Sequence, residues 1–137
     1  MEFAYNTSRT WLFSAGYPPA VAAANKRALE IIEEEPSRVR ELWEKRDYFQ
    51  SGLESIGYDT GNSETPIVPA IVGDSHKAKR LASRLFEEGV FTMSIVYPMV
   101  PRGQARIRNQ VNVGLSEDDL DEALGAYERL GRELEIL

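Results

Sequence analysis

The sequence predicts an α+β domain in which a three-stranded sheet carries helices packed on one face. Apolar residues recur at helical spacing in four segments, and three shorter segments among the later helices have the pattern of strands. The resulting order is helix, helix, strand, helix, strand, strand, helix. This order is typical of a small layer of helices on a sheet, without internal repeats.

Length and composition fit one globular domain. The chain has 137 residues, of which 42% are apolar and 28% are charged. Its net charge of −6 argues against broad nucleic-acid binding. The absence of cysteine excludes disulfides, thiolate zinc sites and cysteine nucleophiles. With neither a signal peptide nor a membrane span in the sequence, we expect a cytoplasmic protein without nucleic-acid or membrane partners.

Residues 1–17 have no convincing period, and we interpret them as an N-terminal arm. The arm is too apolar for a solvated tail, so we expect it to pack between subunits or between domains. Its aromatic residues are Tyr5, Trp11, Phe13 and Tyr17.

Residues 18–137 form the predicted C-terminal α/β domain, which begins with two linking helices over 18–57. Pro18 and Pro19 suit a first helical turn, where the missing N–H group costs nothing. Pro36 separates the two helices, and Gly57 follows the second as a C-terminal cap.

The sheet and its remaining helices are predicted over residues 66–137. The first strand ends at Gly73 and contains Pro69, which indicates an edge strand or an irregular one. Asp74 or Ser75 caps the following helix, which ends at Gly89.

Two further strands are predicted over 90–97 and 105–113, followed by a last helix that Ser116 caps. Strand side chains alternate between faces, so 105–113 has an apolar face and a polar face. The apolar face consists of Ile107, Val111 and Val113, and the polar face of Arg106, Arg108, Gln110 and Asn112.

The polar face of this strand permits two interpretations. It can be a solvated outer face with incidental arginines. It can also be an anion site, because arginine stays charged and donates two parallel hydrogen bonds to a carboxylate or phosphate. The alternation alone does not decide between them.

The stretch "YPMVPRGQARIRNQ" (97–110) resembles the C-terminal signature of the α-oxoamine synthases. Three further stretches resemble the same family in the same order: "RTWLFSAGYPPAVAAA" (9–24), "GYDTGNSETPIVPAIVGD" (57–74) and "LFEEGVF" (85–91). The family includes glycine C-acetyltransferase (2-amino-3-ketobutyrate CoA ligase), 8-amino-7-oxononanoate synthase, 5-aminolevulinate synthase and serine palmitoyltransferase.

The resemblance implies the small C-terminal domain of a pyridoxal-phosphate (PLP) enzyme of fold type I, the aspartate-aminotransferase type. Such an enzyme condenses an amino acid with an acyl-CoA, with or without decarboxylation according to the member. The chain resembles only the last third of the family's usual length, so the domain that carries the PLP lysine is missing. We therefore expect no catalytic residue here, no activity from this chain alone, and surface positions for its four lysines, Lys26, Lys45, Lys77 and Lys79.

The resemblance leaves the choice of substrate open. "GQARIR" favours a glycine C-acetyltransferase, which uses glycine and acetyl-CoA. "GNSETPI" is shared with 8-amino-7-oxononanoate synthases, which are the alternative. Leu115 stands where many members of the family have a histidine, and this departure bears on specificity.

The resemblance assigns roles to two residues. It implies that Arg108 holds the α-carboxylate of the amino-acid substrate, against the alternative of a structural salt bridge. It implies that Ser14 reaches the PLP phosphate of the neighbouring subunit in a homodimer, against the alternative of a turn or capping serine. Arg106 is expected to add supporting charge, and His76 is expected to be exposed and without chemistry.

Two other function classes remain open, and no metal site is predicted. A domain of this kind could bind anions or dimerise without catalysing a reaction. RNA binding is disfavoured because the polar strand face carries no aromatic residue on which a base could stack. The acidic run 33–35 lacks histidine or cysteine partners that would indicate a metal site.

Overall fold

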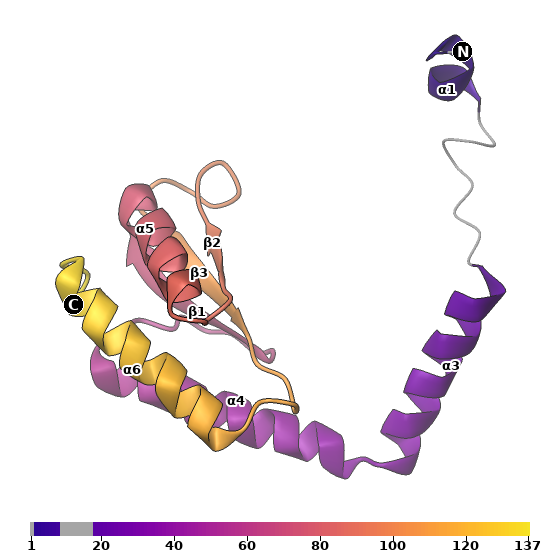
Figure 1. Cartoon of the computed structure of the whole chain (residues 1–137), viewed down its shortest axis with the longest axis horizontal. Helices are drawn as coiled ribbons and strands as arrows, with labels where there is room; N and C mark the ends of the chain where they lie inside the picture. The colour runs from indigo at the N-terminus through magenta and orange to yellow at the C-terminus, as the bar shows by residue number, and fades with distance from the viewer. Residues whose placement is uncertain (1, 9–17) are drawn as a thin grey trace. The chain divides into compact units, whose positions relative to one another are not determined.

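The computed structural model describes residues 2–8 and 18–137, and the chain divides into two compact units, Met1–Pro36 and Ser37–Leu137 (Figure 1). The division falls after Pro36, so the two predicted linking helices belong to different units. Each unit is described by itself below.

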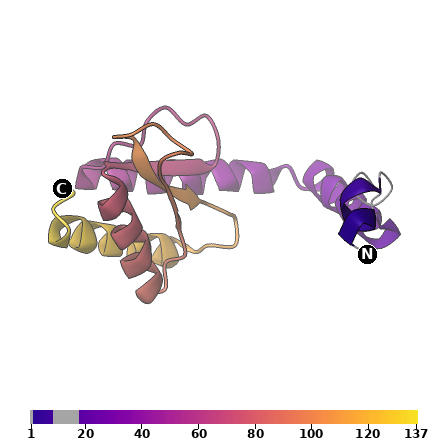
Figure 2. The same cartoon turned by 90° about the horizontal axis from the view of Figure 1, so that it is seen from above.

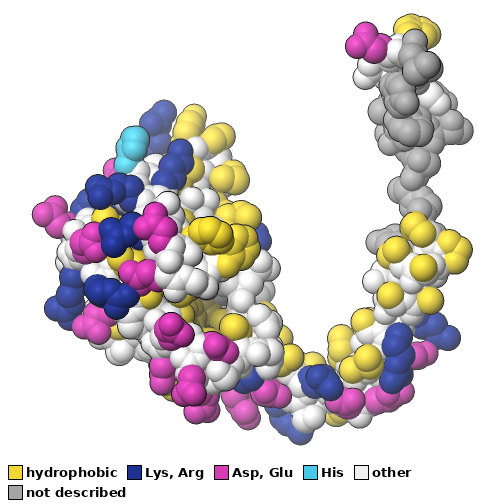
Figure 3. All heavy atoms as spheres, in the orientation of Figure 1, with side chains coloured by type: hydrophobic (Ala, Val, Ile, Leu, Met, Phe, Trp, Pro, Cys, Tyr) yellow, Lys and Arg dark blue, Asp and Glu magenta, His cyan; other side chains and the backbone are white. Residues whose placement is uncertain are grey.

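The first unit contains helix α1 (Glu2–Thr7) and helix α3 (Pro19–Glu34). We predicted no element at 2–7, because six residues are too short to display a helical period. α3 begins as expected, with Pro18 at its N-cap and Pro19 in its first turn. It has no buried residue, and Figure 3 shows apolar side chains at its surface. The large ones are Val21, Leu29 and Ile32.

The second unit is a three-stranded antiparallel sheet with three helices, in the strand order β1–β3–β2. Helices α4 and α5 pack against the strands, and α6 packs against both of these helices and reaches β3 through Tyr127 (Figure 2). This arrangement confirms the predicted fold class. The elements are α4 (Ser37–Ile56), β1 (Ile67–Gly73), α5 (Ser75–Glu87), β2 (Met93–Ile95), β3 (Ala105–Gln110) and α6 (Glu117–Glu133).

The core lies between the sheet and these helices. Val68 pairs with Asn109 and Ala70 with Ile107, so one face of β1 and β3 is buried. Removing apolar side chains from water at this face is the main stabilising contribution. The largest fully buried side chains of the core are Tyr127, Leu53, Leu81, Leu85, Ile107, Leu130 and Val68.

The predicted helix caps are present. Asp74 caps α5, and its carboxylate accepts hydrogen bonds from the N–H groups of His76 and Lys77. Ser116 caps α6 in a reciprocal pair with Asp119, whose side chain accepts from the Ser116 backbone in return.

Two strands are shorter than predicted. β2 begins at Met93 rather than at residue 90, because the Val90 N–H still bonds to the Leu85 carbonyl at the end of α5, at 2.8 Å. β3 ends at Gln110 rather than at residue 113, and the Val111 N–H bonds to the carbonyl of Pro66, before the start of β1.

Pro69 lies in an edge strand, as predicted. The Ile71 N–H bonds to the Asp59 carbonyl at 2.9 Å, and the Ile67 N–H bonds to Thr65 Oγ1 at 3.3 Å. Both bonds point away from β3. Pro69 lies between these two residues, at a position whose N–H would point the same way, so the proline costs the sheet no internal hydrogen bond.

Candidate functional site

Arg108 lies on the open face of the sheet, in its central strand. The buried positions of β3 are Ala105, Ile107 and Asn109, so Arg106 and Arg108 point to the opposite face. This confirms the predicted alternation. The register places Arg108 between Pro69 of β1 and Met93 of β2. A central strand with a partner on each side holds an arginine more rigidly than a loop does.

Within the part of the chain that the structure describes, the guanidinium of Arg108 uses few of its hydrogen-bond donors. One terminal nitrogen, Nη2, donates to Gln110 Oε1 at 3.2 Å. The Nε atom is buried and has no hydrogen-bond partner among the described residues. No carboxylate within residues 2–8 and 18–137 forms an ion pair with Arg108, so the described contacts give no support to the salt-bridge alternative. A buried donor without a partner is the feature expected of a group that binds a ligand.

The two neighbouring arginines are occupied by nearby groups. Arg106 donates from Nε to the Gln104 carbonyl and from Nη2 to Gln104 Oε1, both at 3.1 Å. The guanidinium of Arg102 stacks over the ring of Tyr97, at 4.3 Å from the centroid. Arg106 therefore has less donor capacity left for a ligand than Arg108, whose one described hydrogen bond comes from Nη2.

Arg108 borders two hollows. The first, of about 420 Å³, lies beside the segment between α4 and β1, and we call it the loop hollow. Its lining is Gly61, Asn62, Ser63, Thr65, Ile67, Pro69, Ile95, Arg106 and Arg108. The second, of about 510 Å³, lies at the end of β3 beside β2 and α6, and Leu115 is part of its lining. Arg108 thus belongs to the lining of both hollows.

A buried polar pair stands directly behind Arg108, and the sequence prediction missed it. The Tyr127 hydroxyl donates to Asn109 Oδ1 at 2.7 Å, and Asn109 Nδ2 donates to the Val68 carbonyl at 3.0 Å. Burial raises the pKa of Tyr127 far above its ordinary value, so the hydroxyl keeps its proton. Asn109 shares the parity of Ile107, and that parity was the available signal for its burial.

Lys45 corrects the expectation that all four lysines are surface charges. Its side chain is only 17% exposed, pairs with Glu41 at 2.7 Å, and donates to the Val113 carbonyl at 2.7 Å. It therefore connects α4 to the segment between β3 and α6. His76 is exposed, as predicted.

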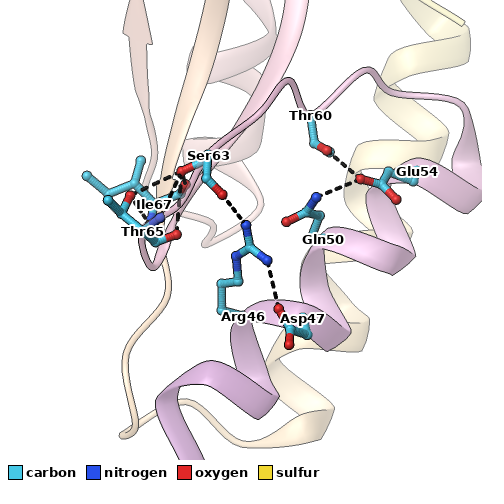
Figure 4. Close-up of polar contacts among 8 residues, drawn as sticks. All are labelled: Arg46, Asp47, Gln50, Glu54, Thr60, Ser63, Thr65 and Ile67. Carbon is cyan, nitrogen blue, oxygen red and sulfur yellow. Dashed lines mark hydrogen bonds and ion pairs between the residues drawn. The ribbon is translucent and has the colours of Figure 1, made fainter. Parts of the chain in front are cut away.

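Arg46 is a second basic residue of α4 that sequence reasoning missed. Figure 4 shows its guanidinium between α4 and the segment that lines the loop hollow, where Nη2 donates to the Ser63 carbonyl. A helical position with charged neighbours gives no signal of such a distant contact.

Ser14 lies outside the described residues, and its role at a cofactor phosphate stays a prediction. Among the residues that are described, no group of three or more potential ligand side chains could hold a metal ion. None of the described helices is long and apolar enough to cross a membrane.

Comparison with known proteins defines the family. A family profile described as "Aminotransferase class I and II" matches residues 1–126. The chain belongs to this family.

Within that family the similar sequences carry specific names. The chain is 50% identical over all its 137 residues to 8-amino-7-oxononanoate synthase of Symbiobacterium thermophilum, and spans 35% of that protein. It is 48% identical over 132 residues to a Thermus thermophilus protein named 8-amino-7-oxononanoate synthase/2-amino-3-ketobutyrate coenzyme A ligase, of which it covers 33%. The chain thus spans about a third of the length of these relatives.

Solved structures agree with the sequence relatives. The fold matches Sphingomonas wittichii serine palmitoyltransferase with a TM-score of 0.82 at 25% identity, over 99% of this chain and 35% of that one. It also matches 8-amino-7-oxononanoate synthase from Francisella tularensis with a TM-score of 0.71 at 19% identity, over 98% of this chain and 38% of that one. The names of the two sequence relatives and of the Sphingomonas structure confirm the resemblance to the α-oxoamine synthases, and the Francisella structure shows the same fold.

Proposed function

We propose that this chain is the substrate-binding C-terminal domain of a PLP-dependent α-oxoamine synthase, and that Arg108 holds the α-carboxylate of its amino-acid substrate. The observation that carries the proposal is the Arg108 guanidinium, whose Nε is buried without a partner among the described residues. A carboxylate would satisfy this donor and neutralise the charge through a bidentate pair.

The available donors fit a carboxylate rather than covalent attachment of PLP. Lys45 is tied to Glu41 and to the Val113 carbonyl, and Lys77 donates to the Glu135 carbonyl. We assign the covalent hold on PLP to the part of the protein that this chain does not span. PLP, when bound, acts as an electron sink for carbanion chemistry. The contribution of Arg108 is to fix the orientation of the amino acid, which lowers the entropic cost of reaction.

For the particular reaction, we propose 8-amino-7-oxononanoate synthesis first. The supporting fact is the name carried by the Symbiobacterium relative, at 50% identity. In 8-amino-7-oxononanoate the carbon that bears the amino group is attached to a methyl group and to the ketone carbon. Alanine supplies this amino carbon and its methyl group when it loses its carboxylate. Leu115 would place an apolar side chain at the neighbouring hollow.

Glycine C-acetyltransferase activity is the second candidate. The Thermus relative bears both names. In 2-amino-3-ketobutyrate the amino carbon keeps a carboxylate and has no methyl group, which is the skeleton of glycine. We further propose a cytoplasmic homodimer in which Ser14 contacts the cofactor phosphate of the neighbouring subunit, with an acyl-CoA as the second substrate. A domain that only binds anions or only dimerises remains the alternative to both reactions.

Titration of the chain with alanine and with glycine at constant ionic strength tests the carboxylate site. The readout is the change in the backbone amide NMR signals of β3, which the wild-type chain and its variants share. We expect Arg108→Gln to weaken binding about 10- to 100-fold, the range for a lost charge-assisted hydrogen bond. Tighter binding of alanine than of glycine would favour the first candidate reaction.

Arg106→Gln is the matched control, because it removes the same charge from the same face. Arg106 already bonds to Gln104, so we expect this variant to keep most of the affinity. Equal affinity in wild type and Arg108→Gln would overturn the assignment of Arg108.

A further inference from the structure

The segment of residues 59–66, which we call the 59–66 loop, lines the loop hollow together with Arg108. It contributes Gly61, Asn62, Ser63 and Thr65 to the lining. Both ends of the loop have local hydrogen bonds. Asp59 Oδ1 accepts from the Gly61 N–H at 2.8 Å, and Ser63 Oγ donates to the Ile67 carbonyl at 2.6 Å.

The α4 helix also holds this loop from outside the hollow. Glu54 Oε1 accepts from Thr60 Oγ1 at 2.5 Å and from Gln50 Nε2 at 2.8 Å. Two turns earlier on the same helix, Arg46 Nη2 donates to the Ser63 carbonyl. Figure 4 shows these two connections side by side, one at the start of the loop and one at its middle.

The surroundings of Arg46 show that its guanidinium is held in place. Its side chain is 13% exposed, Nη1 bonds to Asp47 Oδ1 at 2.7 Å, and the guanidinium lies 5.7 Å from the ring centroid of Trp43. Its Nε is buried and has no partner among the described residues. Burying a charge is costly. The Arg46 side chain would therefore be expected to turn outward into water unless its contact with the Ser63 carbonyl stabilised the inward conformation.

We propose that Arg46 is a positioning residue for substrate binding: through the Ser63 carbonyl it holds the 59–66 loop as the wall that a carboxylate on Arg108 touches. This inference rests on the proposed function. Arg46 does not itself line the loop hollow, so it acts through Ser63 alone. The role needs the planar fork of arginine, which reaches Ser63 and Asp47 with two different nitrogens.

The test uses the full chain with Arg46→Met and Arg46→Lys. Arg84→Met is the matched control, because Arg84 joins α5 to α6 through Glu133 at 2.5 Å and lines neither hollow. Three quantities are measured for each variant: thermal midpoint, backbone amide exchange at Gly61 and Ser63, and the dissociation constant for alanine.

We expect Arg46→Met to stay folded, to exchange the loop amides faster, and to raise the dissociation constant about three- to tenfold, the factor for one lost hydrogen bond. Arg46→Lys should restore only part of the protection of the loop amides and only part of the affinity for alanine. Arg84→Met should alter the thermal midpoint while leaving the loop exchange and the affinity unchanged.

Two results overturn parts of the proposal separately. Unchanged loop exchange in a folded Arg46→Met chain would show that Arg46 does not hold the loop, whatever the affinity. Faster loop exchange with unchanged affinity would show that the wall does not matter for binding. If the wild-type chain binds neither amino acid, the proposed carboxylate site fails, and the loop exchange still decides whether Arg46 is a tether.

Discussion

At the scale of single residues, the buried hydrogen bond between Tyr127 and Asn109 is the core contact that we expect to tolerate substitution least. Replacing Tyr127 by Phe removes the donor to Asn109 Oδ1 and leaves a buried amide oxygen without a partner. We expect a loss of about 1–3 kcal/mol in unfolding free energy, measured by urea denaturation.

Tyr48→Phe is the control for that change. Tyr48 also donates to a side-chain oxygen, that of Asp121, but it is exposed. Water can replace this bond, so we expect an effect within about 0.5 kcal/mol. Equal losses in the two variants would contradict the view that burial makes the Tyr127 bond important.

Buried tyrosines also predict how stability responds to alkaline pH. Burial raises the pKa of Tyr58 to about 12, from an ordinary value of 10.0. The folded chain therefore keeps this proton above pH 10 while the unfolded chain releases it. The contribution to stability is fully present below pH 10 and is lost as the pH rises towards 12.

Urea unfolding between pH 8 and 11.5 checks this expectation. The free energy of unfolding should fall above pH 10, and the fall should be shallower in Tyr58→Phe, which has one fewer proton to release. An unchanged slope in that variant would show that Tyr58 titrates normally in the folded chain.

At the scale of elements, α6 carries two glycines with opposite surroundings. A Cβ atom on Gly131 would collide with the Tyr58 hydroxyl and would lie 2.7 Å from Leu137 Cδ1. We expect Gly131→Ala to cost about 1–3 kcal/mol, the usual range for overpacking a core. Urea denaturation measures the difference.

Gly125→Ala is the matched control on the same helix. A Cβ there meets nothing within 4 Å, so the substitution should stabilise the chain by up to about 1 kcal/mol through helix propensity. Destabilisation by both alanines would mean that the helix, rather than the packing at Gly131, resists the change.

The sequence predicted elements well where local chemistry determines them. Asp74, Ser116 and the alternation around Ile107 are short-range signals, and the structure has all three features. Contacts between distant segments were missed, since no local pattern reports them. Lys45 reaches a carbonyl 68 positions away, and Tyr127 bonds to Asn109 across 18 positions.

The candidate site shows the same limit. Alternation placed Arg108 on the polar face, and the resemblance gave it a role. The Nε without a partner among the described residues, and the hollow that Arg108 shares with the 59–66 loop, depend on the tertiary arrangement, which a sequence pattern does not contain.

At the scale of the whole molecule, every core residue identified in the described part of the chain lies within Ser37–Leu137. Helix α3 has no buried residue. We therefore expect a chain that starts at Ser37 to unfold at the same urea concentration as the full chain. Its free energy of unfolding should agree with that of the full chain within about 0.5 kcal/mol.

Circular dichroism during urea titration of both chains provides the measurement. A clearly lower midpoint for the shorter chain would show that residues 1–36 contribute to the packing of the second unit. An unchanged midpoint would show that the second unit does not need the apolar side chains of α3 for its stability.

The closed outer edge of β1 has a consequence for solubility. An exposed strand edge can recruit a strand from another molecule, which is a route to aggregation. Here Ile67 and Ile71 already donate to Thr65 and Asp59, and Pro69 between them has no donor. The chain therefore presents no row of free N–H groups along β1, and the 59–66 loop that lines the loop hollow also keeps the sheet from growing at that edge.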